Sequence, residues 1–137
     1  MTSVLNPYIS FDGNAREAIE FYQSALGGEL NLNTFAEYGG PPEKADQIMH
    51  GQLKTDAGFT LMVSDTPPGS THEPGNNFSV SLSGDDGDLL RGYWAALSDG
   101  GTVTVPLEKQ MWGDEFGMVI DKFGVPWMVN VAGPQES

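Results

Sequence analysis

The stretch NPYISF at residues 6–11 returns as NFSVSL at residues 77–82, 71 positions later in the chain. A second match, 66 positions apart, sets GFTLMV at 58–63 against GVPWMV at 124–129. Between them, YQSALGG at 22–28 resembles YWAAL followed by Gly100-Gly101. Two copies in register predict a fold with pseudo-two-fold symmetry. In such a fold, function is expected where the copies meet.

Each copy carries the same order of predicted elements. Polar and apolar residues alternate in the strands, apolar residues follow a helical spacing in the helices, and glycine and proline mark the breaks. Asn14, with Glu17 three positions on, predicts the start of the first helix, and Gly27 predicts its end. The expected elements are strands at 4–11, 29–38, 48–55, 59–64, 77–82, 102–107, 116–121 and 126–131, with helices at 14–26 and 87–98.

This order is βαβββ written twice, which predicts an α+β fold. The two modules are expected to form a curved eight-stranded mixed sheet, or two half-barrels, with the helices on the convex face and a cleft on the concave face. The length of 137 residues predicts a single domain. Its expected parts are a first repeat at about 1–64, a linker at 65–76 that is rich in proline and glycine, and a second repeat at about 77–137.

Composition narrows the range of partners. Six Lys and Arg against nineteen Asp and Glu leave a net charge of −13, which repels phosphate backbones and anionic lipid surfaces. We therefore expect an acidic protein that binds neither nucleic acid nor membranes. The chain has no cysteine, and no signal peptide or membrane-spanning stretch is seen in its sequence, so a cytoplasmic location is expected.

Several separated motifs carry a family resemblance. They are YISFDGNA at 8–15, EFY at 20–22, IMH at 48–50, LMVSD at 61–65, PGNN at 74–77, WG at 112–113, FGMV at 116–119 and DKFGVPW at 121–127. With these motifs the chain resembles the vicinal oxygen chelate superfamily, which holds glyoxalase I, bleomycin-resistance proteins and extradiol dioxygenases. It is most similar to the PhnB-like branch. The resemblance implies paired βαβββ modules, a small-molecule ligand and a homodimer.

Alternation also separates the two faces of the predicted sheet. The face toward the helices is expected to hold Ile9, Phe11, Met49, Leu53, Leu61, Val63, Phe78, Val80, Leu82, Val119, Trp127 and Val129. The cleft face is expected to hold Asn6, Tyr8, Ser10, His50, Gln52, Thr60, Met62, Asn77, Ser79, Phe116, Met118, Met128 and Asn130. Apolar walls with a few polar groups suit a small-molecule site. The alternative is that these side chains fill a closed barrel or face solvent.

The candidate ligand-binding residues come from this cleft face and from the loop before it in the second copy. They are Asn6, Tyr8, His50, Gln52, Met62, Asn77, Ser79, Trp112, Phe116 and Met128. Trp112 either caps the cleft or packs at a subunit interface, since an exposed tryptophan is costly. The residues leave open whether the cleft is completed within one chain or across two.

In metal-dependent members of the superfamily, four His and Glu ligands lie on the first and fourth strands of each copy. The resemblance places these positions at Asn6, Met62, Asn77 and Met128 in this chain. Amides bind hard or borderline divalent ions weakly, and thioethers prefer soft ions. We therefore expect no metal site and no cofactor.

These features favour a metal-free protein that binds a small organic molecule. The alternative is a glyoxalase-type lyase or isomerase, or another enzyme acting on a small metabolite, with or without a metal. His50 is the candidate catalytic residue, as a general base or a hydrogen-bond donor, because it is the histidine expected on a strand. A ligand-free structural dimer is the third possibility.

Overall fold

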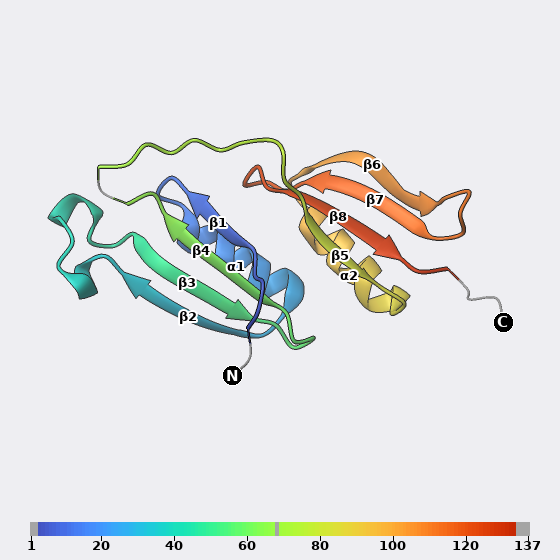
Figure 1. The fold of residues 1–137 in the computed structure, drawn as a ribbon, viewed down its shortest axis with the longest axis horizontal. Helices are drawn as coiled ribbons and strands as arrows, with labels where there is room; N and C mark the ends of the chain where they lie inside the picture. The colour runs from blue at the N-terminus through green and yellow to red at the C-terminus, as the bar shows by residue number, and fades with distance from the viewer. Residues whose placement is uncertain (1–2, 68, 134–137) are drawn as a thin grey trace. The chain divides into compact units, whose positions relative to one another are not determined.

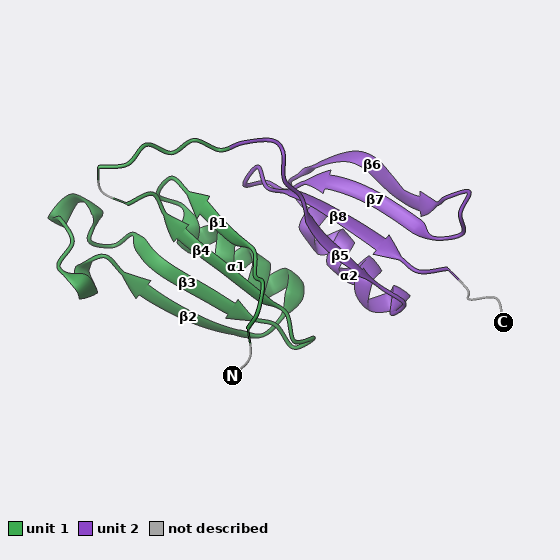
Figure 2. Ribbon diagram, viewed as in Figure 1, with its two compact units in different colours: residues 1–74 green, residues 75–137 purple. Residues whose placement is uncertain are grey.

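The computed structural model describes residues 3–67 and 69–133. Within them the chain forms eight strands in two four-stranded sheets, together with two α-helices (Figure 1). The chain divides into two compact units, residues 1–74 and 75–137 (Figure 2). The predicted α+β class and tandem βαβββ modules are confirmed. No helix in the described part of the chain is long and apolar enough to cross a membrane.

Unit 1 contains the first module. Its elements are β1 (Tyr8–Phe11), α1 (Ala15–Leu26), β2 (Glu29–Thr34), the 3₁₀ turns η1 (Ala36–Tyr38) and η2 (Pro42–Lys44), β3 (Ile48–Lys54) and β4 (Thr60–Asp65). The strand order is β1-β4-β3-β2, with β1 parallel to β4 and the other pairs antiparallel. One face of this sheet packs on α1; we call the opposite face the outer face of unit 1.

Unit 2 repeats the arrangement. Its elements are β5 (Val80–Gly84), α2 (Gly87–Ser98), β6 (Thr102–Lys109), β7 (Glu115–Ile120) and β8 (Pro126–Val131). The order β5-β8-β7-β6 again has one parallel pair, β5 with β8. We call the face of this sheet opposite α2 the outer face of unit 2.

Burial on the two helices follows the sequence repeat. The pairs Ile19 and Leu90, Tyr22 and Tyr93, and Leu26 and Leu97 are each 71 positions apart, and all six side chains are buried. They pack on sheet residues such as Val63 in unit 1 and Val129 in unit 2, which are both fully buried. The apolar stripe on each helix therefore forms the core of its own module.

The hairpin that joins the last two strands also repeats, at the second spacing of 66. In unit 1 the Thr55 N–H donates to the Phe59 carbonyl oxygen at 2.9 Å, and in unit 2 the Asp121 N–H donates to the Val125 carbonyl oxygen at 2.9 Å. The carboxylate of Asp121 also accepts the N–H groups of Phe123 and Val125, and the indole N–H of Trp127 at 2.9 Å. This buried carboxylate fixes the turn and the largest core side chain of unit 2 together.

The first strands of the two units do not keep the register that the sequence match predicts. Met62 in β4 pairs with Tyr8, whereas its counterpart Met128 in β8 pairs with Ser81. The match at 71 positions would have placed Ser79 there. Compared with the position of β1 along β4, β5 is therefore displaced by two residues along β8.

A shorter strand–helix connection in unit 2 explains this shift. The carbonyl oxygens of Phe11 and Gly84 end the two parallel ladders in the same way, each accepting a backbone N–H at 2.7 Å from the residue after the partner strand. Ile19 follows Phe11 by eight positions, whereas Leu90 follows Gly84 by six. Because side chains alternate with a period of two, a shift of two residues leaves each side chain on its predicted face.

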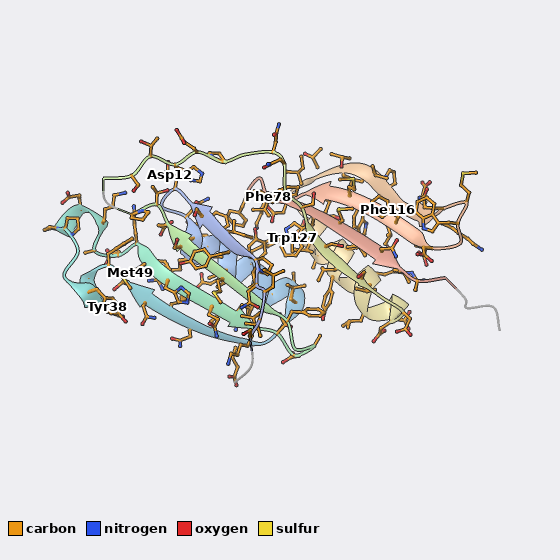
Figure 3. All side chains as sticks on the ribbon, viewed as in Figure 1. Asp12, Tyr38, Met49, Phe78, Phe116 and Trp127 are labelled. Carbon is orange, nitrogen blue, oxygen red and sulfur yellow. The ribbon has the colours of Figure 1, made fainter. Side chains whose placement is uncertain are left out.

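The shift places Asn77, Phe78 and Ser79 outside the strand that was predicted for residues 77–82, since β5 begins at Val80. The expectation that Phe78 faces the helix is wrong, because its side chain is 80% exposed on the segment before β5 (Figure 3). Asn77 and Ser79 are exposed as well.

A bulge in β3 corrects a second expectation. Asn33 pairs with His50 but Thr34 pairs with Ile48, so Met49 is an extra residue in the ladder. The side chain of Ile48 is fully buried, and Met49 is only partly buried near the start of β3 (Figure 3). The bulge reverses the alternation, because an inserted residue shifts the phase of the pleat by one. Ile48 therefore occupies the core position that was predicted for Met49.

Asp65, the last residue of β4, joins three elements of unit 1. Its buried carboxylate accepts the backbone N–H of Ala15 at 2.9 Å and that of Ile48 at 2.8 Å. It therefore holds the first residue of α1 and the first residue of β3 at the end of β4. The sequence placed Asp65 at the start of the linker, and in the structure it is the last residue of β4.

Asp65 also replaces the helix cap that was predicted from the sequence. The Asn14 side chain makes no capping hydrogen bond, so the expected capping box with Glu17 is absent. In α2 the side chain of Asp86 does cap the helix, accepting the N–H of Leu89 at 3.2 Å. A cap from a distant strand cannot be found by reading the residues next to the helix.

We predict that Asp65→Ala lowers the free energy of unfolding of unit 1 by about 2–4 kcal/mol, because two buried backbone N–H groups lose a charged acceptor. Urea unfolding followed by far-UV circular dichroism measures the change. Asp12→Ala, at an exposed position in the turn before α1, is the matched control. A loss below about 0.5 kcal/mol, the size of an ordinary surface substitution, would contradict this role for Asp65.

Candidate functional site

The outer face of unit 1 brings together four of the predicted site residues. Tyr8 pairs with Met62, Met62 pairs with Gln52, and Gln52 pairs with Asn31, which makes one row across the sheet. His50 lies on the same face, two positions before Gln52 in β3. Asn6, a fifth predicted residue, lies two positions before Tyr8 and is half-buried, outside β1.

Tyr8 and His50 contact each other directly. The Tyr8 hydroxyl lies 3.2 Å from His50 Nδ1, and their ring centroids are 5.7 Å apart with a tilt of 40°. The two residues stand on β1 and β3, so the phenol reaches past Met62 on the intervening β4. The tyrosine side chain is still 52% exposed. The contact with His50 thus holds the tyrosine ring across β4, the strand that carries Met62. Both rings stay open to a ligand.

Two asparagines on this face were not among the residues predicted from the sequence. Asn31 pairs with Gln52, and Asn33 pairs with His50, so both point to the outer face. Their alternation with Leu30 and Leu32 was the available signal, because the leucines take the helix side. With them, unit 1 presents three carboxamides around the imidazole of His50.

The outer face of unit 2 is built differently. Ser81, Met128 and Met118 form one row, since Met128 pairs with both of the others. Phe116 and Asn130 pair in the next row. Two thioethers and a phenyl ring make this face more apolar than the corresponding face of unit 1.

Trp112 lies in the hairpin between β6 and β7, beside Phe116. The two ring centroids are 6.4 Å apart, and Trp112 remains 62% exposed. Figure 3 shows Phe116 near the start of β7, next to this hairpin. An exposed indole held against a second ring is suited to stack on a flat ligand.

The carboxylate of Asp114 links the hairpin to the end of β8. It accepts the Gly133 N–H at 2.8 Å and the Asn130 amide at 3.0 Å. The Gly133 hydrogen bond, then the Asn130 amide, and then a hydrogen bond from the Trp112 side chain lower the pKa of Asp114 below its ordinary value. This network fixes the end of β8 to the loop that carries Trp112.

Glu115, the first residue of β7, joins the sheet to α2. Glu115 forms a two-fold hydrogen-bonded ion pair with Arg91, one bond running from Arg91 Nε at 3.1 Å. The hydrogen bond to Arg91 lowers the pKa of Glu115, and the same bond raises the pKa of Arg91. Arg91 also lies 3.5 Å from Asp88 on its own helix. The pair is structural, since it secures the start of β7.

The resemblance placed the metal-ligand positions at Asn6, Met62, Asn77 and Met128. Asn6 and Asn77 lie before β1 and β5, so other residues stand opposite the two methionines. Tyr8 stands opposite Met62, and Ser81 stands opposite Met128, so each unit offers a hydroxyl and a thioether. This donor set does not fit a hard or borderline divalent ion, for which carboxylates and imidazoles are the usual ligands. Within residues 3–67 and 69–133, no three His, Asp or Glu side chains gather as a metal-binding group would require.

Two βαβββ modules, each with one sheet face covered by a helix and one face free of helices, define the class of glyoxalase-like proteins. The family model for the glyoxalase, bleomycin resistance protein and dioxygenase superfamily matches residues 4–129, and this chain belongs to that superfamily. The chain is 32% identical to the protein YjdN of Escherichia coli over 146 aligned positions, covering 96% of this chain and 97% of that protein.

Solved structures agree with this assignment. The crystal structure of PA1353 from Pseudomonas aeruginosa is 38% identical, with a TM-score of 0.85 over 95% of this chain and 98% of the other. A PhnB protein from Bacillus cereus, described as a putative 3-demethylubiquinone-9 3-methyltransferase, is 20% identical, with a TM-score of 0.74 over 95% of this chain and all of the other. At that identity the second likeness concerns the fold alone. The resemblance to the superfamily is confirmed, and the PhnB protein shares the fold.

We predict that Asp114→Asn destabilises the protein most near neutral pH. A carboxylate whose pKa is lowered by folding stabilises the folded state above its unfolded pKa of about 3.9, and this contribution is lost as the pH falls through the lowered value. The difference in urea midpoint between wild type and variant should therefore shrink below about pH 4.

Asp46→Asn, in an exposed loop of unit 1, is the control for removing one negative charge. An Asp114→Asn deficit that stays constant from pH 7 to pH 3 would show that the ionised carboxylate is not the stabilising group.

Proposed function

We propose that this chain is a metal-free protein that binds small organic molecules, with the outer face of each sheet as a binding surface. The observation that carries the proposal is the composition of the outer face of unit 1. Between the ends of its described strands it holds Tyr8, His50, Gln52, Met62 and the two asparagines, without a charged side chain. A face that only met water would be expected to carry charged residues, which abound elsewhere in this chain.

Unit 2 supports the same function with different groups. Met118, Met128 and Phe116 supply an adaptable apolar surface, and Trp112 supplies an exposed ring at its edge. Thioether and aromatic surfaces bind flat organic molecules without demanding one geometry. The roles of Asn6, Asn77 and Ser79 in binding stay predictions, as do the homodimer, the single-domain organisation and the cytoplasmic location.

We predict that aromatic compounds quench the tryptophan fluorescence of the protein in a saturable way through Trp112. Trp127 is 1% exposed, and Trp94 in α2 is partly buried against Gly117, so both are more shielded from a ligand than Trp112, which is 62% exposed. Replacing Met128 with Lys should weaken binding about tenfold or more, because a ligand seated there would bury an unpaired charge.

Met111→Lys is the matched control, since Met111 is 99% exposed and lies at the hairpin tip. The proposal fails if none of a panel of neutral, anionic and cationic aromatic compounds quenches the fluorescence. Equal weakening by both lysine variants would place the ligand elsewhere.

A second candidate function is a lyase or isomerase acting on a small metabolite. The hydrogen bond between the Tyr8 hydroxyl and His50 Nδ1 favours it, because a phenol and an imidazole in contact can pass a proton to and from a bound substrate. The superfamily to which the chain belongs is named for enzymes as well as for a resistance protein.

Metal content tests whether the protein is metal-free. We predict that the purified protein contains well below one equivalent of Zn, Ni, Mn or Fe per chain, and that dialysis against EDTA leaves ligand binding unchanged. The reason is the hydroxyl and thioether pairs at the ladder positions described above. One tightly held metal ion per chain, lost together with binding on chelation, would favour the enzyme.

A further inference from the structure

We propose that Tyr8 fixes the tautomer of His50, so that the outer face of unit 1 presents the imidazole Nε2–H to an uncharged ligand carbonyl. The inference rests on the proposed binding function and names the chemical class of ligand that this face selects. Tyr8 is then a positioning residue and His50 is the donor.

The geometry provides the first step. The hydroxyl of Tyr8 reaches Nδ1 of His50 at 3.2 Å from a strand that is not its neighbour in the sheet. The tyrosine ring stays half-exposed while it makes this contact. If the side chain rotated freely, its hydroxyl would hydrogen-bond to water instead. The backbone of His50 is held in the ladder opposite Asn33, and the Tyr8 hydroxyl engages Nδ1 of its ring.

The protons provide the second step. A neutral imidazole has one N–H, and the hydrogen bond made by one nitrogen decides which nitrogen carries it. Of the two groups, the phenol is the better donor and the unprotonated ring nitrogen is the better acceptor. The Tyr8 hydroxyl therefore donates to Nδ1, which leaves the proton of neutral His50 on Nε2 as a free donor.

The charges provide the third step. On the described strands of unit 1, the charged side chains of the outer face are Glu29 and Lys54. These two residues stand opposite each other at one end of the ladder between β2 and β3. Around His50 the neighbours are the carboxamides of Asn33 and Gln52 and the thioether of Met62. On these strands no cationic side chain lies beside His50 to attract an anion, and the net charge of −13 repels anions further. No carboxylate lies beside His50 on these strands to attract a cation. An uncharged carbonyl oxygen matches a neutral N–H donor at no electrostatic cost.

The experiment uses three probes with the same ring and different charge: benzamide, benzoate and benzylammonium. They are titrated at pH 8, where histidine side chains are ordinarily neutral, into the full chain labelled with ¹⁵N. Backbone amide shifts in β1, β3 and β4 measure binding, and the ¹⁵N shifts of the imidazole report the tautomer of His50. The variants are Tyr8→Phe and, as the matched control, Tyr38→Phe, whose ring is 63% exposed in η1.

We expect wild-type His50 in the Nε2–H form, with benzamide bound more tightly than either charged probe. Tyr8→Phe should shift the tautomer balance toward Nδ1–H and weaken benzamide binding about three- to tenfold, the range for one uncharged hydrogen bond. Tyr38→Phe should change neither reading. A purely structural role for Tyr8 would leave the tautomer signal unmoved.

The inference is overturned if wild-type His50 is in the Nδ1–H form, if benzoate or benzylammonium binds as tightly as benzamide, or if Tyr8→Phe has no effect. These results leave the proposed binding function standing. If none of the three probes shifts the amides of β1, β3 or β4, the ligand class assigned to unit 1 is wrong. The proposed function itself fails only if Trp112 quenching is absent as well.

Discussion

The buried carboxylate of Asp65 is the interaction on which the arrangement of unit 1 depends. It accepts the first N–H of α1 and the first N–H of β3 from the end of β4, and so brings three chain segments to one point. The contact with Ile48 lies beside the bulge at Met49, where the alternation of β3 reverses. This is how Ile48 can be buried in the core while His50 faces outward next to Tyr8. The bulge beside this contact thus sets which side chains of β3 face the candidate site.

In unit 2, side-chain carboxylates also join chain segments, but at other places in the module. Its buried carboxylate, Asp121, holds the hairpin between β7 and β8 and the indole of Trp127. Asp114 holds the opposite end of β8 to the loop of Trp112. The two modules therefore share their fold and their helix packing, whereas their stabilising carboxylates stand at different positions. The two modules also differ in the side chains of their outer faces.

That difference matters for function. The outer face of unit 1 offers hydrogen-bonding groups around one imidazole, and the outer face of unit 2 offers thioethers and aromatic rings. The first surface suits a polar small molecule, and the second suits a flat apolar one. The superfamily includes proteins named for binding and proteins named for catalysis, so membership alone does not choose between them. The donor chemistry at the ladder positions and the Tyr8–His50 contact are the features that distinguish the candidates.

The sequence by itself determined the βαβββ order, the buried stripes of the helices and the face on which Tyr8, Gln52, Met62 and Met128 lie. Periodicity and repeated spacing are local properties, and both survive the two-residue shift of β5. Only the tertiary structure decided the ladder register, because it depends on the length of the strand–helix turn and not on the strand residues. For the same reason Asn77 and Ser79 lie before β5, whereas the bulge in β3 puts Ile48 in the place expected for Met49. Contacts between distant segments, such as Asp65 with Ala15 and Tyr8 with His50, have no signature in sequence spacing, since the sheet order brings those residues together.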